Sequence, residues 1–512
     1  MFRVSGVETA PIVGVCLATV SAIFVKVSFQ SKNKLRLDRS IPDFDDEPVG
    51  PVEQTTGTLS AVYKQERAFP LLLLGFSLLA WAGLQLWNVY EKTSFNFKGF
   101  YLASGLIFFM QTVLAVLHRP YKAKQAGDDK HVVVLIPAYN ESEIALRHCL
   151  ESLLAQTRRP DEVHVVDDGS KQSYAKLKKW FTAEAAAAGV AVTWVKKRKN
   201  LGKRAAHATG LQKVKARDNT IIVTVDSDGI LDKHAIREGL KPFEDTHVES
   251  VAGLLLTKNL RSSLLTRITD LIFLGMQQLI DRSAMSELNS VLVNSGSLAF
   301  YRMPVIADAL ANGYTHERFL GRHVEFSDDS FLTLFALLKG KTVQQPTAMV
   351  FSDMPQRMSH HVRQQMRWMR GSFIRSFWRI RYLPVLSWGF IRQLVGWITL
   401  LVNTTILVEI LFVLPIEKHA PIPAIVFVIP VALGFIQSAR YFTIVRSDVP
   451  LRAQIGIFLL SPIAAVWSIV VLRAFRVWGM ITCWKTGWGT RHKVEIEHDE
   501  QLTLEPITEE VE

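Results

Sequence analysis

The chain has 512 residues, 49% of them hydrophobic, and a formal net charge of +12, so it is long enough for several domains. Its basic character suits nucleic acid, an anionic membrane surface or a phosphate-bearing substrate, but no zinc-finger spacing or RNP-type sequence supports nucleic acid. The three cysteines, Cys16, Cys149 and Cys483, lie far apart and match no disulfide or metal framework, which fits a reducing compartment.

Long apolar segments crowd both ends of the chain, whereas residues from about 128 to 350 have the composition of a soluble domain. A segment of about 20 apolar residues is long enough to cross a bilayer. One segment, 11–29, is marginal because it contains Lys26, and it is predicted to be an uncleaved anchor. Glu409 and Arg440 are charged residues inside apolar segments, which predicts a polar path between helices. The alternative for Arg440 is that its side chain extends along the helix to the membrane surface. The four segments that fit the length well are 69–87, 100–117, 394–414 and 422–442.

The basic residues beside these segments predict their orientation, because cytoplasmic flanks carry an excess of Lys and Arg. Positive charge gathers at 32–39 and at 119–124, on either side of the first two long segments, so both flanks and the middle domain are predicted to be cytosolic. Residues 453–484 are flanked by positive charge at both ends and contain Pro462. We expect them to form a re-entrant or interface-lying pair that returns to the cytosol.

The middle of the chain alternates between strands and helices. Apolar runs within 131–141, 161–170 and 219–231 predict buried parallel strands, and the last two end in carboxylates. Alternation of strand and helix predicts an α/β domain with a parallel sheet, in which ligands bind beyond the carboxyl ends of the strands. The acidic residues at these strand ends are therefore predicted to face the ligand.

Seven short motifs occur in the order and rough spacing of the processive family 2 glycosyltransferases: IPAYNE, VVDDGS, NLGKRAAH, VDSDG, SDDSFLT, QQMRW and WGTR. Over about residues 69–493 the chain particularly resembles hyaluronan synthases, along with chitin synthases and nodulation chitooligosaccharide synthases. The resemblance implies a GT-A α/β domain with a mostly parallel sheet, embedded between transmembrane helices with amphipathic interface helices. The implied divisions are an N-terminal membrane region (1–127), the cytosolic catalytic domain (128–357), the QQMRW segment and interface helix (358–393), a C-terminal membrane region (394–484), and a gating segment with an acidic tail (485–512).

Four acids are assigned to the nucleotide-sugar donor. Asp226 and Asp228 put two carboxylates on one side of a loop, and carboxylate oxygens are ligands that suit Mg²⁺ or Mn²⁺. By resemblance Asp228 is the direct ligand, and a capped acidic turn is the alternative interpretation. Asp167 and Asp168 look like the pair that addresses uridine in this family.

The resemblance also implies a diphosphate contact and a catalytic base. Lys203 and Arg204 are expected to contact the diphosphate or the donor sugar, with a solvated basic loop as the alternative. In the SDDS motif the family pattern puts the base at Asp329, which leaves Asp328 on the acceptor side. Hyaluronan synthases usually have Gly-Asp-Asp-Arg here, so Ser327 and Ser330 are departures that bear on the substrate more than on the reaction.

Residues of the QQMRW motif are expected at the cytosolic mouth of a channel. Gln364 and Arg367 would contact the donor, and Trp368 would stack on the acceptor sugar. A basic and aromatic helix on the membrane surface is the alternative for this stretch. Ser295 and Gly296 match the acceptor-site loop, in which glycine lets the backbone approach a sugar. Here Asn294 and Ser297 stand where hyaluronan synthases commonly have Cys and Pro.

Two further segments have family counterparts. Trp488 and Arg491 of the WGTR motif resemble a gating segment that folds over the bound nucleotide. Residues 262–280 resemble an interface helix, while their apolar periodicity fits a buried core helix equally well.

The sequence thus predicts a processive inverting transferase, in a multi-pass protein of the cell membrane, that polymerises UDP-sugars and passes the product through its own helices. Hyaluronan, made from UDP-GlcNAc and UDP-GlcA, is the expected product. A chitin-like or other β-glycan homopolymer is the alternative polymer, and a non-processive transferase that acts on a lipid carrier is the alternative activity. The expected partners are the UDP-sugar donors, the growing polysaccharide and the lipid bilayer, and not nucleic acid.

Overall fold

The computed structural model describes residues 59–64, 98–123, 127, 129–215, 217–417 and 425–487. The predicted membrane segments 11–29 and 69–87 lie outside these residues, as do Trp488 and Arg491.

A mixed sheet of eight strands forms the centre of the middle domain, in the order β4-β3-β2-β5-β8-β7-β11-β6. Its strands are β2 (His131–Ala138), β3 (Glu162–Asp167), β4 (Ala191–Lys196), β5 (Thr220–Val225), β6 (Ile230–Leu231), β7 (Val248–Thr257), β8 (Leu298–Arg302) and β11 (Lys341–Ser352). Strands β2 to β5 run parallel, as predicted.

The expectation of a mostly parallel sheet needs correction at β8 and β6. Strand β8 is antiparallel to both of its neighbours, β5 and β7, and β6 is antiparallel to β11. Leu298, the first residue of β8, pairs with Val225, the last residue of β5, so the chain enters β8 from the carboxyl edge of the sheet. Apolar runs show which strands are buried but not in which direction they run.

Helices cover both faces of the sheet, which explains why its strands are continuous apolar runs. Val132 and Val134 of β2 pack in one core with α4 (Glu143–Leu154), α5 (Ala175–Ala187), α7 (Ala235–Leu240) and η1 (Lys241–Glu244). Val133 and Leu135 pack in another core with α6 (Lys203–Leu211), α10 (Met303–Ala311) and α11 (Asp328–Lys339). With both faces covered, the strand ends are left for a ligand.

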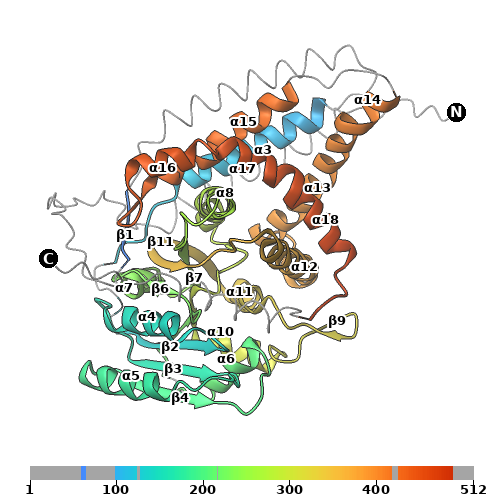
Figure 1. The fold of residues 1–512 in the computed structure, drawn as a ribbon. Helices are drawn as coiled ribbons and strands as arrows, with labels where there is room; N and C mark the ends of the chain where they lie inside the picture. The colour runs from blue at the N-terminus through green and yellow to red at the C-terminus, as the bar shows by residue number, and fades with distance from the viewer. Residues whose placement is uncertain are drawn as a thin grey trace, which may run out of the picture.

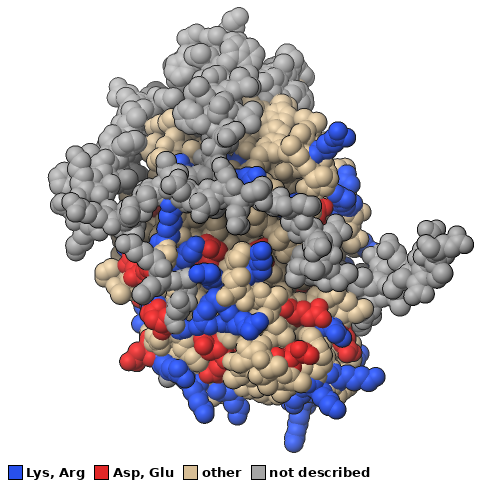
Figure 2. All heavy atoms as spheres, turned by 90° about the vertical axis from the view of Figure 1, so that its left-hand side faces the viewer, with Lys and Arg blue, Asp and Glu red and all other residues tan. Residues whose placement is uncertain are grey.

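A layer of helices lies beside the sheet, at the top of Figure 1. On the face shown in Figure 2, charged side chains gather over the lower part of the molecule, away from this layer. A short sheet of β1 (Ala61–Tyr63) and β12 (Ile444–Arg446) borders the layer, and the hairpin of β9 (Arg318–Phe319) and β10 (Arg322–His323) lies at the edge of the domain. The layer consists of α3 (Lys98–Leu117), α13 (Trp388–Val408), η3 (Glu409–Val413), α14 (Leu414–Glu417), α15 (Ile425–Ser438), η4 (Ala439–Thr443), α16 (Leu451–Phe458), α17 (Ser461–Val466), η5 (Trp467–Leu472) and α18 (Arg473–Ile481).

Two helices in the described part of the chain are long and apolar enough to cross a bilayer, judged by length and composition alone. They are Trp388–Val413, which contains most of the predicted segment 394–414, and Ser461–Ile481. The predicted segment 100–117 is helical within α3. The predicted segment 422–442 is interrupted, since α15 ends at Ser438 and a 3₁₀ turn follows.

The segment 453–484 breaks near Pro462, as predicted, because α16 ends at Phe458 and Pro462 lies in the first turn of α17. The residues that flank the segment on either side contact the middle domain. Arg446 donates to the carbonyl of Thr257 at 2.7 Å, and the Glu325 N–H donates to the carbonyl of Thr486 at 3.1 Å. The chain therefore leaves the domain and returns to it, and the predicted re-entrant or interface-lying arrangement of this segment stays a prediction.

Residues 264–287 form one helical segment, α8 (Leu264–Asp270), η2 (Leu271–Arg282) and α9 (Ser283–Glu287). Leu271, Leu274 and Leu279 are almost fully buried, in a core that includes residues of β7, β11 and α17. Of the two interpretations of 262–280, the structure supports a buried helix. Exposed apolar residues, Phe377 and Ile380, lie near the end of α12 (Met358–Tyr382). For this helix, part of the predicted segment 358–393, an interface helix stays a prediction.

Arg440 joins three elements from a fully buried position. Its guanidinium donates to the carbonyls of Ala115 in α3 and Leu279 in η2, each at 2.5 Å, and to Tyr63 Oη in β1 at 2.7 Å. The side chain is therefore a connection within the protein and does not snorkel, which corrects that interpretation.

We expect Arg440→Met to lower the unfolding free energy by on the order of 3 kcal/mol, because buried acceptors of a charged donor lose their partner. The melting temperature of the purified protein in detergent measures this effect. Arg452→Met, at an exposed position of α16, is the control and should melt with the wild type. Equal melting temperatures for all three proteins would contradict the role of Arg440.

Candidate active site

Lys203 lies at the centre of the predicted site. Its Nζ is 2.5 Å from Asp226 Oδ1, after β5, and 3.4 Å from Asp328 Oδ2, at the start of α11. A Cβ added to Gly296 would lie 3.0 Å from the same Nζ and 3.8 Å from Asp329 Cβ. The structure thus brings the lysine, the acids of two motifs and the predicted acceptor loop together.

The loop that carries Asp226 and Asp228 is held from two strands. The hydroxyl of Ser297, just before β8, donates to Asp226 Oδ2 at 2.8 Å. The hydroxyl of Ser352, at the end of β11, donates to Asp228 Oδ2 at 2.9 Å. Both carboxylates therefore sit at the carboxyl edge of the parallel strands, as the strand ends predicted.

Glu141 adds a third carboxyl group beside Asp228. The hydroxyl of Ser227 donates to Glu141 Oε2 at 2.8 Å. Burial, and after it the charge of Asp228, raises the pKa of Glu141 to about 7. Burial and the nearby charge of Asp226 likewise raise the pKa of Asp228. This concentration of negative charge favours a bound cation.

Asp328 and Asp329 are neighbours with opposite pKa shifts. Burial alone would raise the pKa of Asp328, but the charges of Lys203, His207 and Arg204 together outweigh burial and lower the pKa to about 2. Burial and the charge of Asp328 raise the pKa of Asp329 to about 6. Two carboxyl groups whose pKa values are driven apart are suited to different roles, and a pKa near the working pH suits a general base.

Asp167 and Asp168 are buried and bonded to the protein itself. Asp168 accepts hydrogen bonds from Lys197 Nζ at 2.6 Å and from the Gly202 N–H at 2.7 Å. Asp167 accepts one from the Ser170 N–H at 2.8 Å. The pair thus anchors the basic loop and the start of α6, the helix whose first residue is Lys203.

Arg204 points into a buried ionic network. Its guanidinium is 2.7 Å from Glu317 Oε2 and donates to the carbonyls of Phe326 and Ser327. Arg375 of α12 reaches the same Glu317 oxygen at 3.0 Å, and its Nε lies 3.3 Å from Ser330 Oγ. In this structure Arg204 supports the loop before the acid pair, whereas Lys203 contacts the acids.

Ser327 and Gly371 fit together where α12 crosses the start of α11. Ser327 has a left-handed backbone (φ 61°), which is uncommon for a residue other than glycine. A Cβ at Gly371 would overlap Ser327 Oγ, so the close approach of α12 requires glycine there. Trp368 lies three residues, about one helical turn, before Gly371. The contact thus links the QQMRW helix to the loop that positions Asp328 and Asp329.

The side chains of the QQMRW motif differ in their surroundings. The Trp368 ring packs on Phe273 of η2, with ring centroids 5.5 Å apart, and borders a small cavity with Gln365. Gln364 Oε1 is buried and accepts no hydrogen bond within the described part of the chain. Arg367 is partly buried beside them. The hydrogen-bonding capacity of Gln364 Oε1 is therefore unused within the described part of the chain.

The acceptor loop and the C-terminal segment both lie close to the acids. Ser295 is 9% exposed, and its carbonyl accepts from the Leu298 N–H at 3.2 Å. Trp488 and Arg491 lie outside the described residues. Thr486, two residues before Trp488, bonds to Glu325, three residues before Asp328.

Comparison with known proteins identifies the family. The profile described as "Glycosyl transferase family 2" matches residues 133–309. A hyaluronan synthase of Streptococcus pyogenes is 31% identical over 389 residues, which cover 75% of this chain and 88% of that protein. The chain belongs to glycosyltransferase family 2.

Other relatives of this glycosyltransferase include an N-acetylglucosaminyltransferase of Azorhizobium caulinodans, 28% identical over 70% of this chain and 87% of that protein. Among solved structures, the mannosyltransferase PcManGT from Pyrobaculum calidifontis in complex with GDP-Man and Mn²⁺ aligns with a TM-score of 0.48 and 16% identity, over 76% of this chain and 99% of that chain. The enzyme is thus a hyaluronan synthase-like member of the family.

Sequence reasoning missed four side chains that shape the site of this glycosyltransferase: Glu141, Ser297, Glu317 and Arg375. Glu141 lies three residues after the end of β2, so the strand-end argument applied to Asp167 would have found it. Arg375 lies seven residues after Trp368, which puts it two helical turns along the same face of α12. Glu317 precedes a two-residue strand in a loop, and nothing in the sequence pattern points to it.

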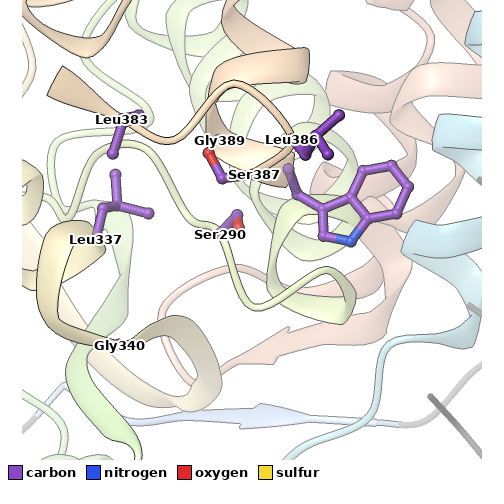
Figure 3. Close-up of a pocket in the computed structure, with 8 residues that line it drawn as sticks. Ser290, Leu337, Gly340, Leu383, Leu386, Ser387 and Gly389 are labelled. Atoms are coloured by element: carbon purple, nitrogen blue, oxygen red, sulfur yellow. The ribbon is translucent and has the colours of Figure 1, made fainter. Parts of the chain in front are cut away.

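A cavity of about 260 Å³ lies apart from the acids, at the start of α13. Figure 3 shows its lining, which contains no acid and no residue of the seven motifs: Ser290, Leu337, Gly340, Leu383, Leu386, Ser387, Trp388 and Gly389. These side chains supply no group for sugar transfer, so the acid cluster is the candidate active site.

We expect Asp329→Asn to lower sugar transfer by at least about 10²-fold while UDP binding persists, because an amide cannot take up a proton. In the wild type only the ionised carboxylate acts as a base, so the rate should rise with pH through about 6. Initial rates of UDP release between pH 5 and 8 test both statements. Asp308→Asn, at a surface ion pair with Lys339, is the control. A flat wild-type profile, or loss of UDP binding in Asp329→Asn, would move the base elsewhere.

Arg375 is expected to act as a positioning residue, since it is buried between Glu317 and Ser330. Arg375→Met removes a positive charge whose field reaches Asp329, so the midpoint of the pH profile should shift upward. Arg381→Met, at the exposed end of the same helix, is the matched control. A lower melting temperature with an unchanged pH midpoint would show that Arg375 serves stability alone.

Proposed function

We propose that this glycosyltransferase is a membrane-embedded processive enzyme that polymerises UDP-sugars into a β-linked polysaccharide, namely hyaluronan from UDP-N-acetylglucosamine and UDP-glucuronate. The observation that carries the proposal is the contact of Gly371 with Ser327, which sets the Trp368 helix against the loop of the acid pair. An acceptor stacked on Trp368 would then lie within reach of the base. The likeness to hyaluronan synthase over 88% of that protein's length supports the choice of product.

In the proposed reaction Asp329 is the general base. The acceptor hydroxyl gives its proton to the carboxylate of Asp329 while its oxygen bonds to the anomeric carbon of the donor, and the bond from that carbon to UDP breaks on the opposite face. This displacement inverts the anomeric configuration. Asp328, which stays ionised beside Lys203, and the loop of Ser295 and Gly296 would hold the acceptor.

Asp226 and Asp228 fit a divalent cation, Mg²⁺ or Mn²⁺. The described residues contain no group of three acids, histidines or cysteines arranged for a metal. Mg²⁺ commonly takes one or two carboxylates and completes its shell with substrate phosphates and water, so two from the chain suffice. The carboxyl group of Glu141 adds to the attraction for a cation. When bound, the ion supplies charge neutralisation for the departing diphosphate.

The remaining donor contacts follow the family pattern. Lys203 would move from Asp226 toward the diphosphate, and Gln364 and Arg367 would reach the donor from α12. Trp488 and Arg491 would close over the nucleotide. We propose two roles for Asp167 and Asp168: they hold the loops around Lys203, and they contact the uridine of the donor. Arg204 acts on the donor indirectly, by holding the same loops.

The membrane arrangement is also a proposal. A cytosolic catalytic domain and a multi-pass anchor in the cell membrane agree with the two long apolar helices, Trp388–Val413 and Ser461–Ile481. They also agree with the return of the chain to the domain at Thr486. The product would then pass through the helical layer.

The experiment that tests the function supplies purified protein in lipid vesicles with radiolabelled UDP-GlcNAc and UDP-GlcA, singly and together, with Mg²⁺ or Mn²⁺. We expect a long product only from the pair, which hyaluronidase digests, and no product in the presence of a chelator. Asp329→Asn serves as the inactive control.

The alternatives give different products. A long product from one donor, sensitive to chitinase, would replace hyaluronan by a homopolymer. A single sugar on a lipid would end the processive proposal.

A further inference from the structure

A strongly basic surface lies on one side of the middle domain. Residues 171–199 contain eight Lys and Arg residues and one acid, Glu184. Lys196 and Lys197 pair with Asp167 and Asp168, at 3.6 and 2.6 Å. The other six are exposed, and none of them forms an ion pair with a residue in the described part of the chain. We call these six the basic face: Lys171, Lys176, Lys178, Lys179, Arg198 and Lys199.

The basic face is one surface at the carboxyl edge of the sheet. Strands β3 and β4 run parallel and both end at this edge, where the loop after β4 carries Arg198 and Lys199. Lys196 Nζ donates to the carbonyl of Gln172, just before α5, at 3.2 Å, so the start of α5 lies beside that loop. Figure 1 shows α5 and β4 at the bottom of the molecule, and the helical layer at the top. The basic face therefore lies away from a bilayer that surrounds this layer.

The charges of the basic face are unfavourably placed within the described chain. The first turn of α5 contains Lys176 and Lys178 but no acid, and the helix has no side-chain cap. Positive charge at the start of a helix opposes the helix dipole, and six like charges on one surface repel one another. A local arrangement that costs stability is expected where it serves a function. An anionic partner would remove both costs.

The basic face continues into the donor side of the active site. The loop that carries Lys199 ends at Lys203, and Asp168 holds this loop by accepting from the N–H groups of Leu201 at 3.1 Å and Gly202 at 2.7 Å. Four residues span at most about 14 Å, so Lys199 lies within that distance of Lys203. Negative charge bound at Lys199 would therefore weaken the positive potential that attracts an anionic donor to Lys203.

The same chain carries an acidic segment of matching charge. Residues 494–512, which lie outside the described residues, contain eight Asp and Glu residues and no Lys or Arg. We call them the acidic segment. A partner tethered to the same chain has a high effective concentration at its site, which favours the acidic segment over a free anion.

The described chain ends close to the active site. The carbonyl of Thr486 accepts from the Glu325 N–H at 3.1 Å, and a Cβ added to Gly487 would lie 3.9 Å from Glu325 Oε2. Glu325 is three residues before Asp328, which contacts Lys203 at 3.4 Å. The acidic segment is therefore attached on the side of the domain where the basic loop ends.

The acidic segment is long enough to reach the basic face. Through the contacts above, the path from Gly487 to Lys199 is at most about 50 Å, counting about 3.6 Å per residue and extended side chains. About 15 extended residues cover this distance. The acidic segment begins seven residues after Gly487 and ends 25 residues after it. Its later part can therefore lie on the basic face.

Strand β4 offers a place for the backbone of a partner. It is the outermost strand of the eight-stranded sheet, so one row of its N–H and C=O groups faces no other described strand. Within the acidic segment, residues 494–497 (VEIE) and 501–504 (QLTL) alternate between apolar and polar side chains, which is typical of a strand. Addition of an extended segment to an open sheet edge is a common mode of recognition.

We propose that the acidic segment docks on the basic face, along β4 and the start of α5, and lowers the apparent affinity of the active site for the anionic donor. The docking is argued from charge and reach, whereas the effect on the donor rests on the proposed function. Salt screens exposed charges, so the acidic segment should bind at low ionic strength and dissociate at high ionic strength. The enzyme would thus contain its own salt-sensitive inhibitor.

Crosslinking tests the docking without any substrate. A carbodiimide joins carboxylates to amines in contact, and mass spectrometry identifies the joined peptides. In the full-length protein in detergent at low ionic strength, we expect crosslinks from the acidic segment to lysines of the basic face. Absence of such crosslinks would refute the docking. Crosslinks that form only between two copies, detected by mixing unlabelled with ¹⁵N-labelled protein, would refute docking within one chain.

Steady-state kinetics test the effect on the donor, with UDP-GlcNAc as substrate and UDP release as the signal. Deletion of 494–512 should lower KM about threefold at low salt and leave kcat unchanged, since it removes a competitor for the positive potential. At high salt the two proteins should have the same KM. In Lys176→Gln/Lys179→Gln, which weakens the basic face, the deletion should no longer change KM.

A matched pair of lysines serves as the control. Lys213 and Lys215 are exposed in the connection from α6 to β5, at the opposite edge of the sheet. In Lys213→Gln/Lys215→Gln the deletion should lower KM as it does in the wild type.

Two kinetic results would overturn the inference. Equal KM values for the full-length and deleted proteins at low salt would refute the inhibition. A deletion effect that persists in Lys176→Gln/Lys179→Gln would place the acidic segment elsewhere. If no form of the protein releases UDP from either donor, the proposed function fails, and the crosslinks still decide whether the acidic segment docks.

Discussion

The ion pairs of Lys203 with Asp226 and Asp328 organise the active site. One ammonium group draws together a loop after β5 and the start of α11, although these acids are 102 positions apart in the sequence. The same charge, with those of His207 and Arg204, lowers the pKa of Asp328, while burial and the charge of Asp328 raise the pKa of Asp329. The division of labour between the two carboxyl groups therefore depends on the lysine. The supports around it, Asp168 on the basic loop and Ser297 on Asp226, keep these groups in place.

Around this centre the protein connects sugar transfer to the helical layer through α12. Glu317 holds Arg204 from α6 and Arg375 from α12 with one carboxylate oxygen. Such a buried network constrains the relative position of two helices because an unpaired charge inside the protein is costly. Arg375 Nε also lies 3.3 Å from Ser330 Oγ, which links the helix that carries Trp368 to the helix that carries Asp329. Beyond it, Arg440 of η4 bonds to α3 within the layer and connects the layer to η2.

The sequence predicted the parts of the fold that depend on local pattern. Apolar runs located β2, β3 and β5, and the carboxyl-edge rule placed Asp226 and Asp228 beside a ligand site. Pattern could not predict the reversal of β8, because periodicity is the same in both strand directions. Nor could it find the bond between Arg375 and Glu317, whose partners are 58 residues apart. Arg204 illustrates the same limit, since a basic motif does not show which of two adjacent cations turns inward.

The fit between Ser327 and Gly371 has a consequence for how this enzyme can vary. The hydroxyl of one residue fills the space that a methyl group on the other would need. A larger side chain on the helix is compatible only with a smaller one in the loop, so neither position is free to change alone. Glycine at position 327 would also adopt the left-handed backbone without strain. The joint change that costs least is therefore glycine at 327 together with a larger side chain at 371. Relatives that differ at one of these positions should therefore differ at both.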